Sequence, residues 1–497
     1  MRDDLHTCEA SHSSGSNQVS RRHMLQLMGA GVAGIAGASV LASCLGLPDQ
    51  KAPVEPTVDL TPRGTAPIAE RPLSPYFMGY NNVPIHSPSW SDPNVLNVVK
   101  ELNAANLRYP GGTVANYWNW QTGWFFSSAP GGFKNAMKTP IHLQDVQNVV
   151  QATNTQPIYV LNLLTSNLDI QMQLLHAAKN QGLPINLIEL GNEFYLDQWP
   201  LDQNVFPSGR EYGTKATEWI KAIHDQFPET KIAVVGTAPI SGNGDPRKGA
   251  WNDQMFQTLK EADAITVHPY VNLPDGLISK GDPAGSMDRL NSTVAARWAQ
   301  FQSLLQGIPG GMKIWVTEYN LASNEADKVF HTWMHGIIVA SMTLSYLADK
   351  RVDLVSFYDM LGNTGNEAVY FDRRGKDQEL PPYTVTAAGW TLRLLGETMQ
   401  GMKSTEPLTI NAAGGGTTVT GWYFTNGLQR RGFIVNASSS DVTWQGQTHF
   451  TSGQTHYQQL TASSPFKTIA DTNDVKVKQG TLQGPLALPA YSVTQLK

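Results

Sequence analysis

Short apolar runs of strand-like length recur along the chain from residue 74, and longer stretches separate them. Many of these runs are rich in β-branched and aromatic residues, as in QPIYVLNLL and KIWVTEYN, which favours buried strands. Eight such runs precede residue 402. Their ranges are 74–83, 104–112, 156–164, 186–193, 231–239, 264–270, 313–320 and 352–360.

The stretches between these runs carry apolar residues at helical spacing, as in NVLNVVKELN at 94–103. The same pattern covers 209–227, 251–262, 287–305 and 326–347. Eight strands, each followed by a helix, predict an α/β fold, a (β/α)8 TIM barrel, over residues 73–401. A doubly wound open sheet is the alternative, but no GxGxxG motif follows the first strand.

The pattern changes after about residue 402, where the helical periodicity stops. Runs such as GTTVTGWYFTN and LPAYSVTQLK alternate apolar and polar residues and are separated by turn residues. This alternation predicts a C-terminal antiparallel β-sandwich over residues 402–497. We expect this domain to brace the barrel, and carbohydrate binding by the domain itself is the alternative.

The N-terminal residues have the features of an export signal rather than of a folded domain. The twin arginine of SRRHMLQ at 20–26 precedes a weakly apolar segment rich in Gly and Ala, which resembles a bacterial Tat signal. LASC at 41–44 resembles a lipobox, so we expect residues 1–43 to be removed and Cys44 to be lipidated. The product would be an exported lipoprotein, periplasmic or at the cell surface, held to the membrane by its lipid anchor. The alternatives are the general secretory route, an ordinary cleaved signal peptide and an uncleaved anchor.

Composition fits a globular protein with an N-terminal tether. The chain has 497 residues, of which 41% are hydrophobic and 15% charged. Its two cysteines, Cys8 and Cys44, would leave no disulfide in the processed chain. Residues 44–72 are rich in Pro and lack periodicity, which predicts a tether. A net charge of −5 without a long basic run gives no indication of a nucleic acid partner, and the oligomeric state is not predicted.

Polar residues gather at the C-terminal ends of the predicted strands, where the active site of such a barrel lies. Glu193 ends the fourth strand and Glu318 lies near the end of the seventh. These two strands face each other across the barrel mouth, so we expect the two carboxylates to converge. Such a pair can cleave a glycosidic bond, because one carboxyl protonates the leaving oxygen while the other attacks or activates water. The alternative is that each glutamate makes a salt bridge at its strand end.

The neighbours of this pair suggest further roles. Arg108, at the end of the second strand, is expected to keep one carboxylate ionised, with a structural ion pair as the alternative. Asn192 is expected to bind a sugar hydroxyl, and His268 and Tyr270 to orient the nucleophile or line the subsite. Further candidates are Tyr358 at the end of the eighth strand and Trp118, Trp120 and Trp124, whose exposed rings would suit stacking on a sugar.

Several of these segments resemble known families. GNE at 191–193 and TE at 317–318 resemble the motifs of the clan A glycoside hydrolases, retaining barrels with catalytic glutamates on strands four and seven. LRYPGGTVANYWNWQTG at 107–123 resembles the strand-two segment of the α-L-arabinofuranosidase and heparanase-like families. YFDRRGKDQELPPY at 370–383 and LPAYSVTQL at 488–496 resemble later segments of the same families.

The resemblance implies a retaining glycoside hydrolase that acts on plant or microbial oligo- or polysaccharides by double displacement. Glu193 would be the general acid/base and Glu318 the nucleophile, Asn192 would bind the sugar 2-hydroxyl, and Arg108 and Tyr270 would support Glu318. The carboxyl groups would lie about 5–5.5 Å apart, against about 6.5–9.5 Å in an inverting enzyme. The pKa of Glu193 would be raised, while Glu318 would stay charged.

Other functions remain open from the sequence. One is a surface lipoprotein that binds carbohydrate without cutting it, and another is transglycosylation or lyase chemistry on the same barrel. The sugar is not determined, since cations in or near the predicted loops would suit a uronic acid. These cations are Arg210, Arg247, Lys248, Arg373 and Arg374. The chain has no HExxH motif, no clustered cysteines and no close His pair, so neither a metal nor a cofactor is expected.

Overall fold

The structure is a computed structural model that describes residues 70–497 with gaps. The gaps are 87, 138, 197–199, 239–244, 364, 372–379, 409–417, 446–449 and 451. The predicted signal segment, Cys44, Arg373, Arg374 and most of the predicted tether therefore lie outside the described residues. Within the described part of the chain, no helix combines the length and the apolar character needed to cross a membrane.

Eight parallel strands close into a barrel and follow one another around it in chain order. All eight apolar runs of the sequence form these strands, which confirms the predicted barrel, although each strand is shorter than its run. The strands are β2 (Met78–Asn81), β3 (Asn106–Tyr109), β6 (Gln156–Val160), β7 (Leu187–Glu189), β8 (Lys231–Val235), β9 (Ala264–Val267), β11 (Lys313–Tyr319) and β13 (Val352–Tyr358).

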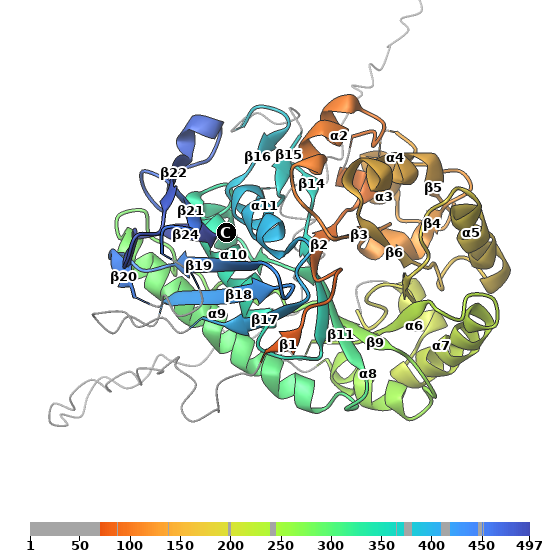
Figure 1. Ribbon diagram of the computed structural model, residues 1–497. Coiled ribbons are helices and arrows are strands. Elements are labelled where there is room, and N and C mark those ends of the chain that lie inside the picture. Colours follow the sequence, from red (N-terminus) through yellow and green to blue (C-terminus); the bar gives the residue numbers. More distant parts are fainter. Residues whose placement is uncertain are drawn as a thin grey trace, which may run out of the picture.

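A long helix follows each barrel strand, and together these helices surround the barrel (Figure 1). They are α2 (Pro93–Lys100), α4 (Leu143–Thr153), α5 (Leu168–Asn180), α7 (Gly209–His224), α8 (Pro246–Phe256), α9 (Pro283–Gln306), α10 (Trp333–Tyr346) and α11 (Ala387–Met399). The short helices α3 (Gly131–Ala136) and α6 (Pro200–Val205) lie in the loops after β3 and β7. The periodic stretches of the sequence correspond to α2 and α7 to α10, but α10 begins at Trp333 rather than at 326.

Alternation along the strands divides the barrel interior into an apolar floor and a polar upper layer. The floor is one buried cluster of six side chains, Ile158, Leu187, Ala233, Ala264, Trp315 and Leu354. Successive side chains of a strand point to opposite faces, so residues two positions further along share the inward face. Glu189 and Thr317 follow Leu187 and Trp315 by two positions, and both are fully buried. The polar layer of the barrel therefore begins within the strands, below the loops.

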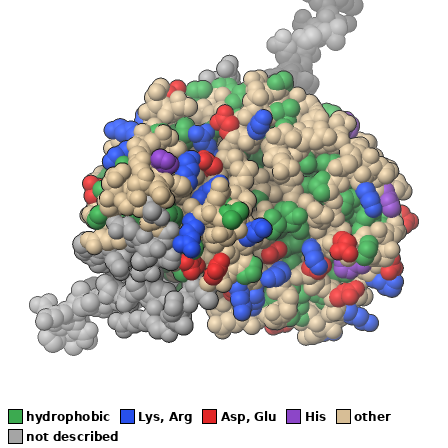
Figure 2. All heavy atoms as spheres, in the orientation of Figure 1, with side chains coloured by type: hydrophobic (Ala, Val, Ile, Leu, Met, Phe, Trp, Pro, Cys, Tyr) green, Lys and Arg blue, Asp and Glu red, His purple; other side chains and the backbone are tan. Residues whose placement is uncertain are grey.

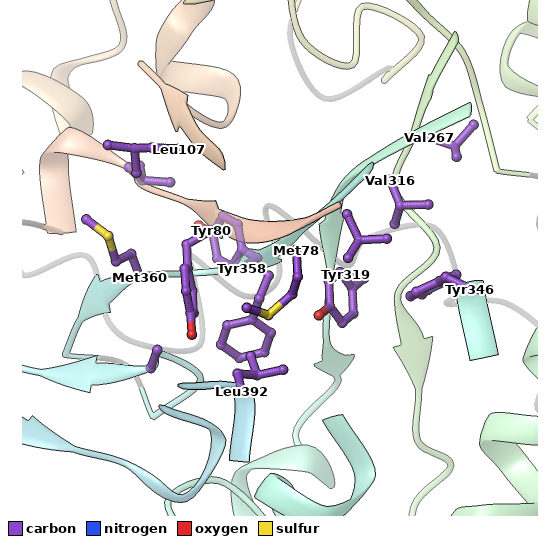
Figure 3. Packing of buried hydrophobic residues seen from close by; sticks show 14 of the residues in the cluster. Met78, Tyr80, Leu107, Val267, Val316, Tyr319, Tyr346, Tyr358, Met360 and Leu392 are labelled. Carbon is purple, nitrogen blue, oxygen red and sulfur yellow. The ribbon is translucent and has the colours of Figure 1, made fainter. Parts of the chain in front are cut away.

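The outward faces of the strands pack against the helices in the main hydrophobic core. Figure 3 shows Met78 and Tyr80 of β2 directed towards Leu392 of α11, with Tyr319 of β11 in the same layer. The approach of α11 to this layer depends on a glycine. A Cβ at Gly396 would lie 2.5 Å from the carbonyl oxygen of Asn103 and 2.9 Å from Cε of Met78.

The C-terminal domain is antiparallel, as predicted. Its seven-stranded sheet has the order β1-β17-β18-β19-β24-β21-β22, and a two-stranded sheet, β20-β23, accompanies it. The strands are β17 (Ser404–Pro407), β18 (Val419–Thr425), β19 (Arg430–Asn436), β20 (Val442–Trp444), β21 (His456–Thr461), β22 (Lys476–Thr481), β23 (Leu486–Leu488) and β24 (Ser492–Leu496). One difference concerns 71–72, which were assigned to the tether. These residues form β1 (Arg71–Pro72), which pairs with β17.

The sheet is attached to the barrel through α10 and α11, which lie beside it in Figure 1. The first N–H groups of a helix have no partner within the helix. At the start of α10, the N–H of Trp333 donates to the carbonyl of Lys467 (2.9 Å) and that of Met334 to the carbonyl of Pro465 (2.7 Å). The indole N–H of Trp333 also donates to the carbonyl of Tyr491 at 2.7 Å. These contacts support the predicted bracing role of the domain.

Two short strand pairs and one small three-stranded sheet add structure around the barrel. They are β4 (Trp118–Asn119) with β5 (Trp124–Phe125), β10 (Val271–Asn272) with β12 (Leu321–Ala322), and β14 (Leu361–Gly362) with β15 (Val369–Tyr370) and β16 (Thr384–Val385). On the outer surface, acidic and basic side chains are interspersed over the face shown in Figure 2.

Candidate active site

Glu193 lies in the loop that follows β7, not within the strand as predicted. The strand ends at Glu189 because the next residues leave the extended conformation, with φ values of 94° at Gly191 and 45° at Glu193. A Cβ at Gly191 would lie 2.2 Å from the ring of Phe194, so only glycine allows this turn. The turn directs the Glu193 side chain to the barrel mouth, where Glu318 of β11 also lies.

His268, in the segment after β9, brings the two carboxylates together. Its Nδ1 lies 2.8 Å from Oε1 of Glu193 and 4.0 Å from Oε2 of Glu318. Those two oxygens are therefore separated by no more than the sum of these distances, about 7 Å. This upper bound accommodates the spacing expected of a retaining pair and excludes most of the inverting range. Glu193 and Glu318 therefore converge at the barrel mouth, as predicted.

Arg108 contacts Glu318, as predicted, and is fully buried. Its Nη1 donates to Oε1 of Glu318 at 2.6 Å. The same guanidinium also makes two contacts to Glu189, at 2.7 Å from Nε and 2.8 Å from Nη2. A third carboxylate, which was not predicted from the sequence, therefore belongs to the cluster.

Two tyrosines lie on the Glu318 side of the site. The hydroxyl of Tyr270 donates to Oε2 of Glu318 at 2.8 Å, which supports the contact that the resemblance implied. The Tyr358 ring lies beside that of Tyr270, with centroids 6.1 Å apart. Tyr358 therefore borders the site, as its position at the end of β13 suggested.

The side-chain oxygen and both backbone polar groups of Asn192 make hydrogen bonds. Its side-chain Oδ1 accepts from Nη2 of Arg108 at 2.7 Å. Its backbone N–H donates to Oδ1 of Asn116 (3.1 Å) and its carbonyl accepts from Nδ2 of Asn116 (2.7 Å). The buried amide of Asn116 thus clamps the residue before Glu193. Nothing in the linear pattern of YPGGTVAN relates this asparagine to β7, so it was not predicted from the sequence.

Two other residues of the site were missed, although the sequence carried a signal for each. Glu189 is an ionisable residue inside the apolar run LIEL, and such a residue is rarely buried without a partner. Tyr195 follows Glu193 by two positions, and its hydroxyl donates to Oε1 of that residue at 3.1 Å. Phe194, between them, packs on Phe206 with centroids 4.6 Å apart.

The prediction of an exposed stacking ring at Trp118 is wrong. Trp118 is only 2% exposed, and its ring packs edge-on against Phe125 with centroids 5.4 Å apart. Its indole N–H donates to the hydroxyl of Tyr109 at 3.1 Å. The reason is the β4–β5 hairpin, which turns the ring inward. The indole of Trp120 is also committed, since it donates to the carbonyl of Ile170 at 3.0 Å.

The cations considered for a uronic acid have different surroundings. Arg247 donates to the backbone carbonyls of Phe194, Phe206 and Pro207 and thereby fixes the loop after β7. Arg210 contacts the side chain of Gln257, away from the carboxylates. Lys248 lies over the Tyr195 ring, 5.1 Å from its centroid, and its charge acts on Glu193.

The charges are not distributed as the resemblance implied. Burial raises the pKa of Glu193, but the charge and hydrogen bond of His268, with Lys248 and Tyr195, lower it to about 2. Burial raises the pKa of Glu318, and the charges of His268 and Arg108 only partly oppose this. Burial opposes a proton on His268, but the negative charges of Glu318 and Glu193 raise its pKa. The direction of the Glu193 pKa is therefore opposite to the expectation, because the charge that His268 carries when protonated lies 2.8 Å from the Glu193 carboxylate.

Among the residues that the structure describes, no group of three or more His, Cys, Asp and Glu side chains has an arrangement that could hold a metal ion. The polar groups that meet at this site are the two carboxylates, His268, Arg108 and the tyrosine hydroxyls. Such a set can attack an electrophilic carbon, hold a negative carboxylate in place and move one proton.

A buried acid behind Glu193 gives a prediction for stability. Asp202 of α6 is fully buried, and the Tyr117 hydroxyl is the one polar side chain that interacts with its carboxyl by hydrogen bonding among the described residues. Burial raises its pKa to about 8, against the opposing charge of Arg247. The folded state thus binds a proton that the unfolded chain releases near pH 4, so this group costs stability as the pH rises from about 4 to 8.

We expect Asp202→Asn to remove this pH dependence. The stability of the variant relative to the wild type should increase with pH, by up to about 1.4 kcal/mol per unit between pH 4 and 8. Urea unfolding of both proteins at pH 5, 6, 7 and 8 measures the difference. Parallel stability curves would show that Asp202 is ionised and paired in the folded protein.

No protein-family profile matches the chain. Among curated proteins, an intracellular exo-α-(1→5)-L-arabinofuranosidase from Bacillus subtilis is 24% identical over 271 residues, which cover 48% of this chain and 52% of that protein. The chain thus spans about half the length of the curated relative that it matches.

Solved structures match over most of the chain. A family 51 α-L-arabinofuranosidase from Bifidobacterium longum has a TM-score of 0.61 at 16% identity, covering 87% of this chain and 97% of its own. An α-L-arabinofuranosidase from Thermotoga maritima has a TM-score of 0.59 at 15% identity, covering 86% and 97%. A 4-O-α-L-rhamnosyl-β-D-glucuronidase from Fusarium oxysporum has a TM-score of 0.58 at 14% identity, covering 87% and 98%. At these identities the likeness establishes a shared fold, a barrel with a C-terminal β-domain.

Proposed function

We propose that this chain is a retaining glycoside hydrolase that cleaves O-glycosidic bonds of plant or microbial oligo- or polysaccharides. The observation that carries the proposal is the convergence of Glu193 and Glu318 on His268 at the mouth of a (β/α)8 barrel. The barrel fold supports it, and so does the arabinofuranosidase that matches about half of the chain. Because the matched proteins include arabinofuranosidases by name, α-L-arabinofuranosides are the first substrates to test.

Each carboxylate has contacts that suit one role. Glu318 is oriented by Arg108 and Tyr270, so one of its oxygens can attack the anomeric carbon and form a glycosyl ester. The glycosidic C–O bond breaks in the same step, and the leaving oxygen takes a proton from Glu193. Glu193 then removes a proton from water, which attacks the anomeric carbon and releases Glu318.

The proton for the first step is held by Glu193 and His268 together. An imidazolium next to a carboxylate and a neutral imidazole next to a carboxylic acid differ only in the place of one proton along the 2.8 Å contact. The lowered pKa of Glu193 and the raised pKa of His268 favour the ion pair, with the proton on His268. A sugar that excludes water favours the neutral pair, because charges are costly to bury. Glu193 then carries the proton where the leaving oxygen needs it.

A panel of aryl glycosides tests the proposal. We expect the purified full chain to hydrolyse one class among arabinofuranosides, xylosides, glucosides, galactosides, fucosides and glucuronides, and Glu318→Gln to abolish the turnover. Product configuration read by proton NMR at early times should be retained. Binding of oligosaccharides without any cleavage would overturn the proposal in favour of a carbohydrate-binding protein, and an inverted product would overturn the roles assigned to the two glutamates.

Tyr195 offers a prediction for the pH dependence. Its hydroxyl stabilises the ionised form of Glu193 through the 3.1 Å hydrogen bond, so Tyr195→Phe should raise the pKa of Glu193. The basic limb of kcat/KM reports loss of the shared proton, and we expect it to move up by about one pH unit. The matched control is Tyr457→Phe in the β-domain, where no shift is expected. A basic limb that stays in place in Tyr195→Phe would contradict the proposed role of Glu193.

For the residues before 70 we propose, from the sequence, export followed by lipidation of Cys44. Metabolic labelling with a fatty acid in a bacterial host tests this, because the label should be lost in Cys44→Ala while the Cys8→Ala control keeps it. Label-free protein in the wild type would contradict lipidation. Export through the Tat route should further require both arginines of SRRHMLQ.

A further inference from the structure

Glu189 lies beneath the reacting carboxylates and makes no contribution to the steps described above. It is fully buried at the end of β7, on the inward face of the barrel, two positions after Leu187 of the apolar floor. Both of its oxygens face the Arg108 guanidinium, and Oε1 also accepts from the hydroxyl of Thr317 at 3.3 Å. A buried carboxylate normally needs such partners, since an unpaired charge in the core is strongly destabilising.

The hydrogen bonds of Arg108 account for all of its donors. A guanidinium has five N–H groups in a rigid plane. Nε and Nη2 donate to Glu189, Nη2 also donates to Asn192 at 2.7 Å, and Nη1 donates to Glu318 at 2.6 Å and to Asn81 at 3.4 Å. The two parallel contacts to Glu189 are the only bidentate ones, and they determine the orientation of the plane. With that plane set, Nη1 has to face Glu318.

The same geometry divides the positive charge of Arg108 between two carboxylates. If Glu318 were its only acidic partner, a fully buried guanidinium at 2.6 Å would make that carboxylate a weak base and a weak nucleophile. Glu189, bound to the opposite edge, offsets part of this charge. The other titratable groups around Glu318 are His268, Glu193, Tyr270, Tyr195 and Tyr358.

We infer that Glu189 is a positioning residue for the nucleophile. Its carboxylate holds the plane of Arg108 so that Nη1 orients Glu318, and its charge keeps Glu318 basic enough to attack. This inference rests on the proposed glycosidase function and adds a third carboxylate to the site. Glutamine at this position would place an NH2 group against an arginine donor and would remove the negative charge.

The test compares Glu189→Gln and Glu189→Asp with the wild type over the pH range of activity. Glu189→Gln should move the acidic limb of kcat/KM down by about one to two pH units, because Glu318 is then ionised more easily. It should also lower kcat/KM at the optimum by about 10- to 100-fold. Glu189→Asp keeps the charge but is one methylene shorter, so it should lower kcat without moving the acidic limb. The control Glu325→Gln changes another buried glutamate, paired with Lys328, and should move neither.

An acidic limb that stays in place in a folded Glu189→Gln would overturn the inference, as would an equal shift in Glu189→Asp. If Glu189→Gln does not fold, Glu189→Asp still decides the positional part, since an unchanged kcat would overturn it. Failure of the proposed function gives a different result from failure of this inference, because the wild type would then be inactive on the panel of aryl glycosides. In that event carbon-13 NMR titration of the Glu318 carboxyl, in the wild type and in each folded variant, measures the same shift without turnover.

Discussion

Replacing Glu193 by alanine is expected to lower kcat by about 10²- to 10⁴-fold for glycosides with a poor leaving group. Such a leaving group needs a proton as the C–O bond breaks, and Glu193 is the carboxyl that shares a proton with His268 at 2.8 Å. A dinitrophenyl glycoside leaves without a proton, so its first step should be almost unaffected in Glu193→Ala. The second step, hydrolysis of the glycosyl ester, should be slow in this variant, because the attacking water lacks its general base.

The measurement is kcat for a series of aryl glycosides with leaving groups of graded acidity, with and without azide. Azide needs no general base, and it should restore turnover of the dinitrophenyl substrate in Glu193→Ala and yield a glycosyl azide of retained configuration. Glu218→Ala on the exposed face of α7 serves as the control and should behave as the wild type. An equal loss for every leaving group, without rescue by azide, would contradict the acid/base role of Glu193.

Replacing Arg108 by methionine should lower the free energy of unfolding more than any of the other substitutions proposed above. The side chains have similar lengths, but the substitution removes the guanidinium that pairs with both buried carboxylates, Glu189 and Glu318. Breaking a buried ion pair from one side costs about 3–5 kcal/mol, so we expect a loss of that order in the free energy of unfolding at pH 7. Activity should fall by about 10³-fold, because Glu318 also loses the donor at 2.6 Å that orients it.

The sign of the pH dependence distinguishes this explanation from a simple packing defect. Without Arg108, protonation of the buried carboxylates is favoured in the folded state, so the deficit should shrink as the pH falls towards 4 and grow as it rises. Urea unfolding of Arg108→Met and the wild type at pH 4.5, 6 and 8 measures this. Lys221→Met, which removes an exposed ion pair with Asp225 on α7, should show no measurable loss at any of these values. A deficit that does not vary with pH would argue against charge as its cause.

The sequence by itself determined the architecture of this protein, because the signals for it are local. Apolar runs of strand length and helical periodicity within the intervening stretches are both written in neighbouring residues, and their alternation leads to a barrel by general packing rules. The change of pattern after about residue 402 marked the β-domain in the same way. The glutamates at 193 and 318 could be paired for the same reason, since strands four and seven of any such barrel face each other.

The tertiary structure alone decided how the charges of the site are shared. Whether Glu193 carries a proton depends on His268, which is 75 residues away in sequence but 2.8 Å away in space. No linear pattern contains that distance. Asn116 and Glu189 act through contacts between different strands and loops, and the Trp118 ring points inward only because a hairpin places Phe125 beside it. Local periodicity specifies which face of a strand is buried. The partners that meet on that face are set by the closure of the barrel.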